Sequence, residues 1–240
     1  MQYKLKGIMG KQSEKLTAGK SANRTAPARS GSEARPSAQF LQPFLSLSAA
    51  RHQHLCPRQV LGIRLGLVGL VQLGLISAAY NDVFHNNDKR LLTIVETDGC
   101  GADGLAVATS CHVGRRTLRV LDFGKVAATL VDTHTRHAVR VSPTPASRQL
   151  AQTYAPDGET KWHRYLLGYQ RIPDAKLVRV VPVKLTQTLA ELLSKPQMRA
   201  ICAICQEEIM NEREIIVDGR PLCQQCAGLG YYQPLESGHE

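Results

Sequence analysis

Two Cys-X-X-Cys pairs near the C-terminus constrain the fold of this chain more than any other feature. Cys202 and Cys205 form the first pair, Cys223 and Cys226 form the second, and seventeen residues lie between the pairs. Each pair makes a tight turn that directs two thiolates at one point, and this spacing is typical of four-cysteine zinc sites. The intervening EIIVDGRPL predicts a β-hairpin with an Asp-Gly turn. We therefore predict a zinc ribbon over 199–232, with a rubredoxin-like iron site and a redox dithiol pair as the alternatives.

The predicted ribbon is too short to fold on an apolar core alone, since it has about forty residues. Metal binding would supply the missing stability, because the ligands are organised only in the folded state. Four cysteines fill all the positions of a tetrahedral ion and leave none for substrate. The predicted zinc is therefore structural and not catalytic.

Charge is concentrated at the N-terminus. The net charge is +10, and the first forty residues contribute +6, from eight Lys and Arg against two Glu. This segment is rich in Ser, Ala and Gly and has no hydrophobic periodicity, so we expect a disordered basic tail over 1–38. A transit peptide and an upstream extension from a misplaced start codon are the alternatives. Residues 233–240 are predicted to form a second tail.

The cysteine count and the apolar segments predict a cytoplasmic protein. Seven cysteines are an odd number, and the chain opens with no secretory apolar region, so reduced thiols are expected. The longest apolar run, residues 60–80, is interrupted by Arg64 and Gln72. A membrane span needs about 20 clean apolar residues. We therefore expect a buried helix and no membrane association.

Hydrophobic patterns predict an α+β domain over 40–195, with a central glycine-rich helix and an antiparallel sheet. Pro57 suits the first turn of a helix that we place over 57–77. Glycines 62, 66 and 69 share one face of that helix, which predicts close packing of another backbone. The remaining expected elements are strands at 90–96 and 177–185, a hairpin across 126–142, and helices at 105–110, with Asp103 as N-cap, and 147–171.

The stretch RHQHLCPRQV carries the first candidate site. In an extended chain His52, His54 and Cys56 would point to one side. Cys56 would adjoin the N-terminus of the helix, where the backbone N–H groups and the dipole favour a thiolate. The alternative is that both histidines are solvated loop residues and that Cys56 is a small buried hydrophobe.

A second group of polar residues follows the strand at 90–96. Glu96, Asp98 and Cys100 alternate as the chain leaves it, and Cys111 follows eleven residues later. Loops that leave a rigid strand often carry function. The alternatives are a plain turn at the glycines and core packing for Cys111.

Together these motifs resemble the formylmethanofuran dehydrogenase E-subunit family. The matching segments include HQHLCP, VLGIRLGLVGL, DKRLLTIVETDGC, DFGKVAATLVD, both CxxC pairs and AGLGYY. The resemblance implies an α+β domain bearing a site lined by Cys and His, followed by a zinc ribbon, in a homodimer. Carried over by position, it implies a second transition-metal site, of unknown metal, at His52, His54, Cys56, Cys100 and Cys111. The candidates for catalysis are His54, Cys56, Asp98 and Cys100.

The resemblance implies a metal-binding subunit or accessory protein of one-carbon or molybdopterin-linked metabolism, in a homodimer or a larger enzyme complex. Whether the chain is itself an enzyme stays open. A zinc-ribbon regulator that binds nucleic acid is the alternative, although aromatic residues are few and the ribbon mixes acidic with basic residues. A thiol enzyme with Cys56 as nucleophile and His54 as base is a third hypothesis.

Overall fold

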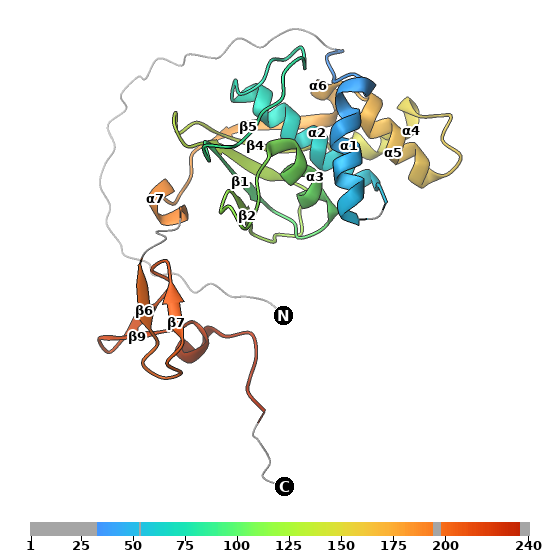
Figure 1. The fold of residues 1–240 in the computed structure, drawn as a ribbon. Coiled ribbons are helices and arrows are strands. Elements are labelled where there is room, and N and C mark those ends of the chain that lie inside the picture. The colour runs from blue at the N-terminus through green and yellow to red at the C-terminus, as the bar shows by residue number, and fades with distance from the viewer. Residues whose placement is uncertain (1–32, 53, 194–197, 236–240) are drawn as a thin grey trace, which may run out of the picture. The chain divides into compact units, whose positions relative to one another are not determined.

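The computed structural model describes residues 33–52, 54–193 and 198–235 (Figure 1). The expected tails at 1–38 and 233–240 lie mostly outside the described residues. Residues 33–37 are described, and they contact the domain. The Asp174 amide donates to Ala34 O at 2.8 Å, and Arg35 donates to Arg171 O at 3.0 Å. The folded domain therefore begins before Phe40, where the sequence placed its start.

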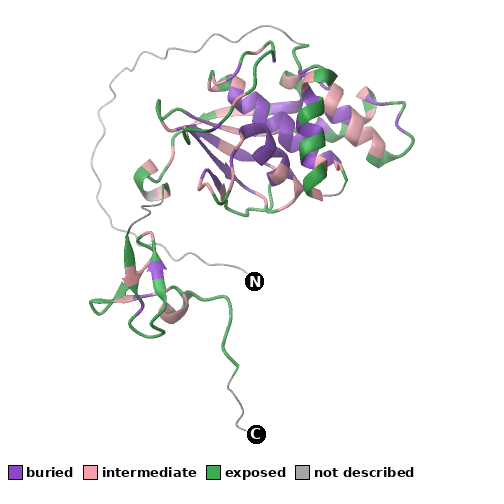
Figure 2. Ribbon diagram, viewed as in Figure 1, coloured by how far each residue is buried: buried purple, intermediate pink, exposed green. Residues whose placement is uncertain are grey.

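Helix α2 (Pro57–Gln72) forms the centre of the domain, as predicted. Its residues from Val60 to Leu70 are all buried (Figure 2). Pro57 begins the helix, where a missing amide hydrogen costs nothing. The helix ends at Gln72 and not at residue 77, because the chain turns at Gly74, whose φ is +69°.

Helix α3 (Cys100–Thr109) packs directly against the glycine face of α2. A β-carbon on Gly62 would lie 2.2 Å from Gly101 O, and one on Gly104 would lie 2.1 Å from Gln59 O. The expected close approach of a second backbone is thus confirmed. The contacts advance in the same direction along both helices, so α2 and α3 run roughly parallel.

We expect Gly62→Ala to destabilise the domain by about 3 kcal/mol, because its β-carbon would overlap a backbone oxygen that cannot move independently of α3. Gly114→Ala is the matched control, since a β-carbon there meets nothing within 4 Å. Urea unfolding of both variants measures the difference. Equal stability of the two variants would show that the helices separate at little cost.

The other helices surround this pair, and several boundaries differ from expectation. Helix α1 (Ala38–His52) is not among the elements expected from the sequence, because Pro43 lies inside it. The helix expected over 147–171 is two helices, α4 (Ser147–Tyr154) and α5 (Lys161–Arg171). Thr160 starts the second by accepting a hydrogen bond from the His163 amide. The remaining short helices are α6 (Asp174–Leu177) and α7 (Leu189–Leu192).

A five-stranded sheet forms the second layer of the domain (Figure 1). Its order is β2-β1-β3-β4-β5, and all neighbours are antiparallel except β1 and β2. The predicted strands and the hairpin are confirmed. The bounds are β1 (Leu91–Val95), β2 (Leu118–Val120), β3 (Ala128–Asp132), β4 (Ala138–Pro143) and β5 (Val178–Val183).

Strand β1 is buried along its whole length because both faces of the sheet are covered there. Leu91 and Val95 belong to the main core with α2 and α3. Leu92 and Ile94 face the opposite way and pack with Val131 in a smaller cluster. Strand β1 lies between β2 and β3, which fixes where the following loop starts, and that loop leads directly into α3.

Arg64, the charged residue that interrupts the apolar run, is paired inside the core. Its side chain is fully buried and donates to Ile172 O at 2.6 Å and to the Asp174 carboxylate at 2.7 Å. The Tyr80 hydroxyl donates to the other oxygen of Asp174 at 2.6 Å. Burial of the tyrosine beside this carboxylate raises the pKa of Tyr80. A charged side chain is stable in the apolar core only when it is paired in this way.

The C-terminal ribbon consists of two small hairpins and a helical turn, Gln225–Leu229. Asp218 and Gly219 form the turn of the second hairpin with φ of 48° and 76°, which confirms the predicted Asp-Gly turn. The strands are β6 (Arg199–Ile201), β7 (Glu208–Met210), β8 (Ile215–Val217) and β9 (Arg220–Leu222). Within the described parts of the chain, we find no helix with the length and apolar character needed to cross a bilayer.

Candidate functional site

The four ribbon cysteines converge on one point. The sulfur atoms of Cys202, Cys205, Cys223 and Cys226 all lie within 4.8 Å of one another. The sulfurs of Cys205 and Cys223 are 3.8 Å apart. Four thiolates at about 2.3 Å from a tetrahedral ion are separated by about 3.8 Å, whereas a disulfide bond is about 2.05 Å long. The cluster therefore has the dimensions of a four-thiolate metal site.

Backbone amides support negative charge in this cluster. The Cys223 amide donates to Cys202 Sγ at 3.4 Å, and the Cys226 amide donates to Cys223 Sγ at 3.4 Å. The first of these bonds is the main cause that lowers the pKa of Cys202 to about 6. A hydrogen bond with Cys223 and burial raise the pKa of Cys226 to about 12. Four thiols this close cannot all ionise without a cation among them, so the donor set fits a metal such as zinc.

A second pair of thiols lies where α2 and α3 begin. Cys56 is the N-cap residue of α2, and Cys100 is the first residue of α3. Because the two helices run roughly parallel in contact, their N-termini lie at the same end of the pair. The proximity of the Cys100 thiol contributes to raising the pKa of the Cys56 thiol, and both cysteines are partly exposed. The structure thus brings together two cysteines that are 44 positions apart.

Cys56 is held in place by its own helix. Gln59 is fully buried, accepts a hydrogen bond from the Cys56 amide at 2.7 Å, and donates to Ser48 O of α1 at 2.8 Å. Burial raises the pKa of the Cys56 thiol, and the neighbouring Cys100 raises it further, while a backbone hydrogen bond at Gln59 opposes the shift. Two thiolates side by side are therefore unfavourable until a cation is bound or the pair is oxidised.

His52 and Asp103 extend this site. His52 Nε2 lies 2.6 Å from Asp103 Oδ2, and the rings of His52 and His54 are 6.3 Å apart. The extended geometry expected at His52 is wrong, because His52 is the last residue of helix α1. The expected capping role of Asp103 is also wrong. Gly99 is the N-cap of α3, and Asp103 lies one turn inside.

The His52–Asp103 pair has the form of a carboxylate-oriented histidine. When Nε2 donates its hydrogen to the carboxylate, Nδ1 has a free lone pair that can bind a metal or accept a proton. His54 is exposed. We define His52, His54, Cys56, Cys100 and Asp103 as the helix-terminal site. Among the described residues, only the ribbon cluster has three or more His, Cys, Asp or Glu ligand atoms within 4.8 Å of one another.

Cys111 lies apart from this site. It follows the C-terminal end of α3, and at 1.5 Å of rise per residue it is roughly 15 Å from Cys100. Its thiol is fully buried, where Asn86 and Thr93 each donate to the sulfur at 3.3 Å. Burial raises the pKa of Cys111. The implied grouping of Cys111 with Cys56 is therefore not observed, and its surroundings match the core-packing alternative.

The loop after β1 carries two carboxylates, Glu96, which is buried, and Asp98, which is exposed. Glu96 is buried and accepts two hydrogen bonds of 2.6 Å from Arg140 on β4. This bidentate pair joins the end of β1 to β4, which lies on the far side of β3 in the sheet. Asp98 is exposed in the turn before α3. Of the alternating residues in this loop, Cys100 is the one that the structure brings to Cys56.

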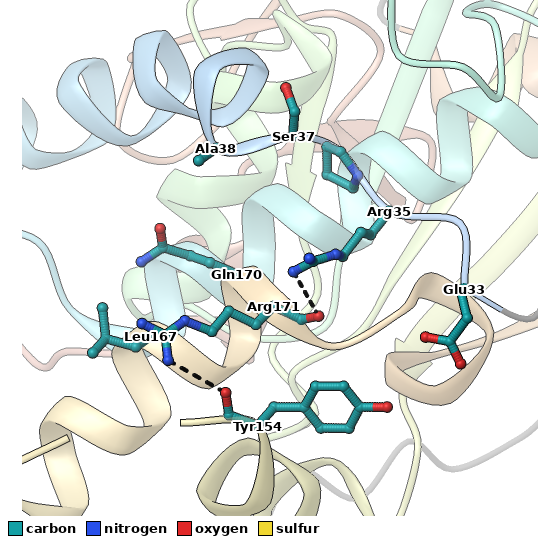
Figure 3. A pocket seen from close by; sticks show the side chains of 9 residues that line it. Glu33, Arg35, Ser37, Ala38, Tyr154, Leu167, Gln170 and Arg171 are labelled. Carbon is teal, nitrogen blue, oxygen red and sulfur yellow. Dashed lines mark hydrogen bonds between the residues drawn. The ribbon is translucent and has the colours of Figure 1, made fainter. Parts of the chain in front are cut away.

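A pocket of about 920 Å³ lies between the segment before α1 and helix α5, with Tyr154 on its wall (Figure 3). No motif in the sequence predicted it. Arg35 donates to Arg171 O, and the Arg171 guanidinium donates to Asp157 and to Tyr154 O. These cations are already engaged with neighbouring acceptors. None of the predicted site residues lines this pocket.

The architecture is thus an α+β domain with paired thiols at two helix N-termini, followed by a four-cysteine ribbon. The FmdE family, described as "FmdE, Molybdenum formylmethanofuran dehydrogenase operon", matches residues 51–179, just over half of the chain. The chain belongs to this family.

Two further comparisons concern the fold and part of the sequence. A tungsten formylmethanofuran dehydrogenase FmdE-like protein from Syntrophus aciditrophicus has the same fold, with a TM-score of 0.53 and 18% identity over 80% of this chain and 94% of that one. A probable S-adenosyl-L-methionine-binding protein of Archaeoglobus fulgidus is 38% identical over 90 residues. That match spans 38% of this chain and only 24% of the relative.

Proposed function

We propose that this protein is a metal-binding member of the FmdE family with two separate sites. The ribbon cysteines hold a structural zinc, and the helix-terminal site holds a transition metal that stays accessible to a ligand. The observation that carries the second site is the meeting of Cys56 and Cys100 at two adjacent helix N-termini, beside the His52–Asp103 pair. Thiolate and imidazole donors suit soft or borderline cations.

Each group of the helix-terminal site has a distinct role in this proposal. Cys56 and Cys100 supply thiolates, and the positive ends of the two helix dipoles favour their charge. Asp103 orients His52, whose Nδ1 would complete the protein ligands together with His54. A metal with an incomplete protein shell acts as a Lewis acid towards a bound ligand. The partial exposure of both cysteines supports such access.

The biological role is proposed from the family name. Formylmethanofuran is a one-carbon carrier, so we propose that the protein serves one-carbon or molybdopterin-linked metabolism as a subunit or accessory protein.

We further propose a cytoplasmic homodimer, which can join a larger enzyme complex. Size measurement in solution tests the dimer. Failure to retain DNA or RNA on a filter at both low and high salt would remove the nucleic-acid alternative.

Elemental analysis of purified protein tests the two-site proposal. We expect two equivalents of metal in the parent chain and one in Cys56→Ser, since loss of one thiolate opens the helix-terminal site but leaves the ribbon intact. Cys111→Ser is the matched control, and it should keep both equivalents because Cys111 lies in the core. If Cys56→Ser retains every metal atom of the parent, the helix-terminal metal site does not exist.

A further inference from the structure

Cys56 and Cys100 are held together by features that do not depend on metal. The close backbone approach of Gly62 to Gly101 and of Gly104 to Gln59 places the N-termini of α2 and α3 side by side. Gln59 also fixes the backbone of Cys56 through its amide. The two thiols therefore remain neighbours with a high effective concentration, as in other tethered pairs.

The same thiols are accessible, unlike the remaining cysteine of the domain. Cys56 and Cys100 are partly exposed, whereas Cys111 is sealed in the core with its sulfur hydrogen-bonded. Cys56 is the N-cap of α2 and Cys100 is the first residue of α3, so both accessible thiols lie at the same end of the helix pair. Paired and reachable thiols of this kind are susceptible to reversible oxidation.

We propose that Cys56 and Cys100 form a reversible intramolecular disulfide by exchange with a low-molecular-weight disulfide such as glutathione disulfide. One protein thiolate attacks the glutathione disulfide, its S–S bond breaks, and one glutathione thiolate leaves. The second protein thiolate then attacks the protein sulfur of the mixed disulfide and releases the other glutathione. Two electrons pass to glutathione, and the two thiol protons are taken up by the leaving thiolates.

This disulfide regulates the helix-terminal site. The oxidised pair offers no thiolate, so it cannot bind the metal assigned to the same cysteines. That regulatory consequence rests on the proposed function, whereas disulfide formation itself requires only the two neighbouring thiols. Bound metal in turn protects the pair from oxidation, because its thiolates are then occupied.

The test uses the full chain with zinc bound in the ribbon and no metal at Cys56 and Cys100. The protein is incubated with glutathione disulfide, alkylated, and digested without reduction for mass spectrometry. We expect a Cys56–Cys100 linked peptide and the loss of two alkylatable thiols. The parent should also carry at least about tenfold less glutathione adduct than Cys100→Ser. Cys56→Ser and Cys100→Ser should each retain one stable adduct. Circular dichroism verifies that both variants fold.

Three outcomes would overturn the inference: glutathione adducts on the parent equal to those on Cys100→Ser, no loss of thiols, or a link from Cys56 to another cysteine. The experiment also separates this inference from the proposed function. A Cys56–Cys100 disulfide in a protein whose Cys56→Ser variant loses no metal would support disulfide formation and refute the metal site. Metal loss without any disulfide would do the reverse.

Discussion

Cys202→Ser is expected to remove the ribbon metal and unfold residues 199–232 while the α+β domain stays folded. The described ribbon buries only Cys202, Ile209 and Leu222 as apolar side chains, so its own core contributes little. A structural zinc supplies roughly 10–16 kcal/mol of apparent binding free energy. Hydrogen exchange should show the amides of the ribbon unprotected, and elemental analysis should show one metal equivalent fewer.

Ile204→Ser is the control for the ribbon, because Ile204 lies between the two cysteines of the first pair and is 58% exposed. It should keep the metal and the amide protection. A Cys202→Ser variant with protected ribbon amides would show that the two hairpins are stable without metal. The structural role of the four-cysteine cluster would then be refuted.

Arg64→Met is expected to destabilise the α+β domain by about 3–5 kcal/mol, the usual cost of removing one partner of a buried ion pair. The Asp174 carboxylate and the backbone oxygens of Tyr169 and Ile172 would lose their donor inside the core. For a domain of this size, the Tm should fall by about 10 °C. Calorimetry or urea unfolding measures the change.

Arg148→Met is the matched control, because that side chain is exposed, and its effect should stay within about 0.5 kcal/mol. Adding Asp174→Asn to Arg64→Met should recover part of the loss, since no uncompensated charge then remains. A loss below about 1 kcal/mol for Arg64→Met alone would contradict the structural role of the buried pair.

Local patterns in the sequence predicted most elements of the domain and failed where a local rule was overridden by packing. Helix α1 was missed because it contains Pro43, although Leu41, Phe44 and Leu45 on the same helix are buried in the core. The capping preference of aspartate predicted Asp103 as the N-cap of a helix at 105–110. The structure starts the helix at Cys100 with Gly99 as the N-cap, and the Asp103 side chain instead contacts His52 of α1.

The helix-terminal site was only partly predictable for the same reason. The sequence marked the thiols of residues 56, 100 and 111 as candidates, but spacing along the chain does not say which of them meet. Cys100 and Cys111 lie at opposite ends of α3, so a helix packed parallel to α3 can present its first residue to only one of them. That packing direction is a property of the folded domain.

The sequence by itself determined the metal-binding ribbon, because two Cys-X-X-Cys turns joined by a hairpin form a site from nearby residues. It also predicted the close helix packing, because glycines on one helix face leave room for another backbone to approach. Only the tertiary structure paired Cys56 with Cys100 and His52 with Asp103. These contacts join residues 44 and 51 positions apart, and their geometry depends on how three helices pack around one core.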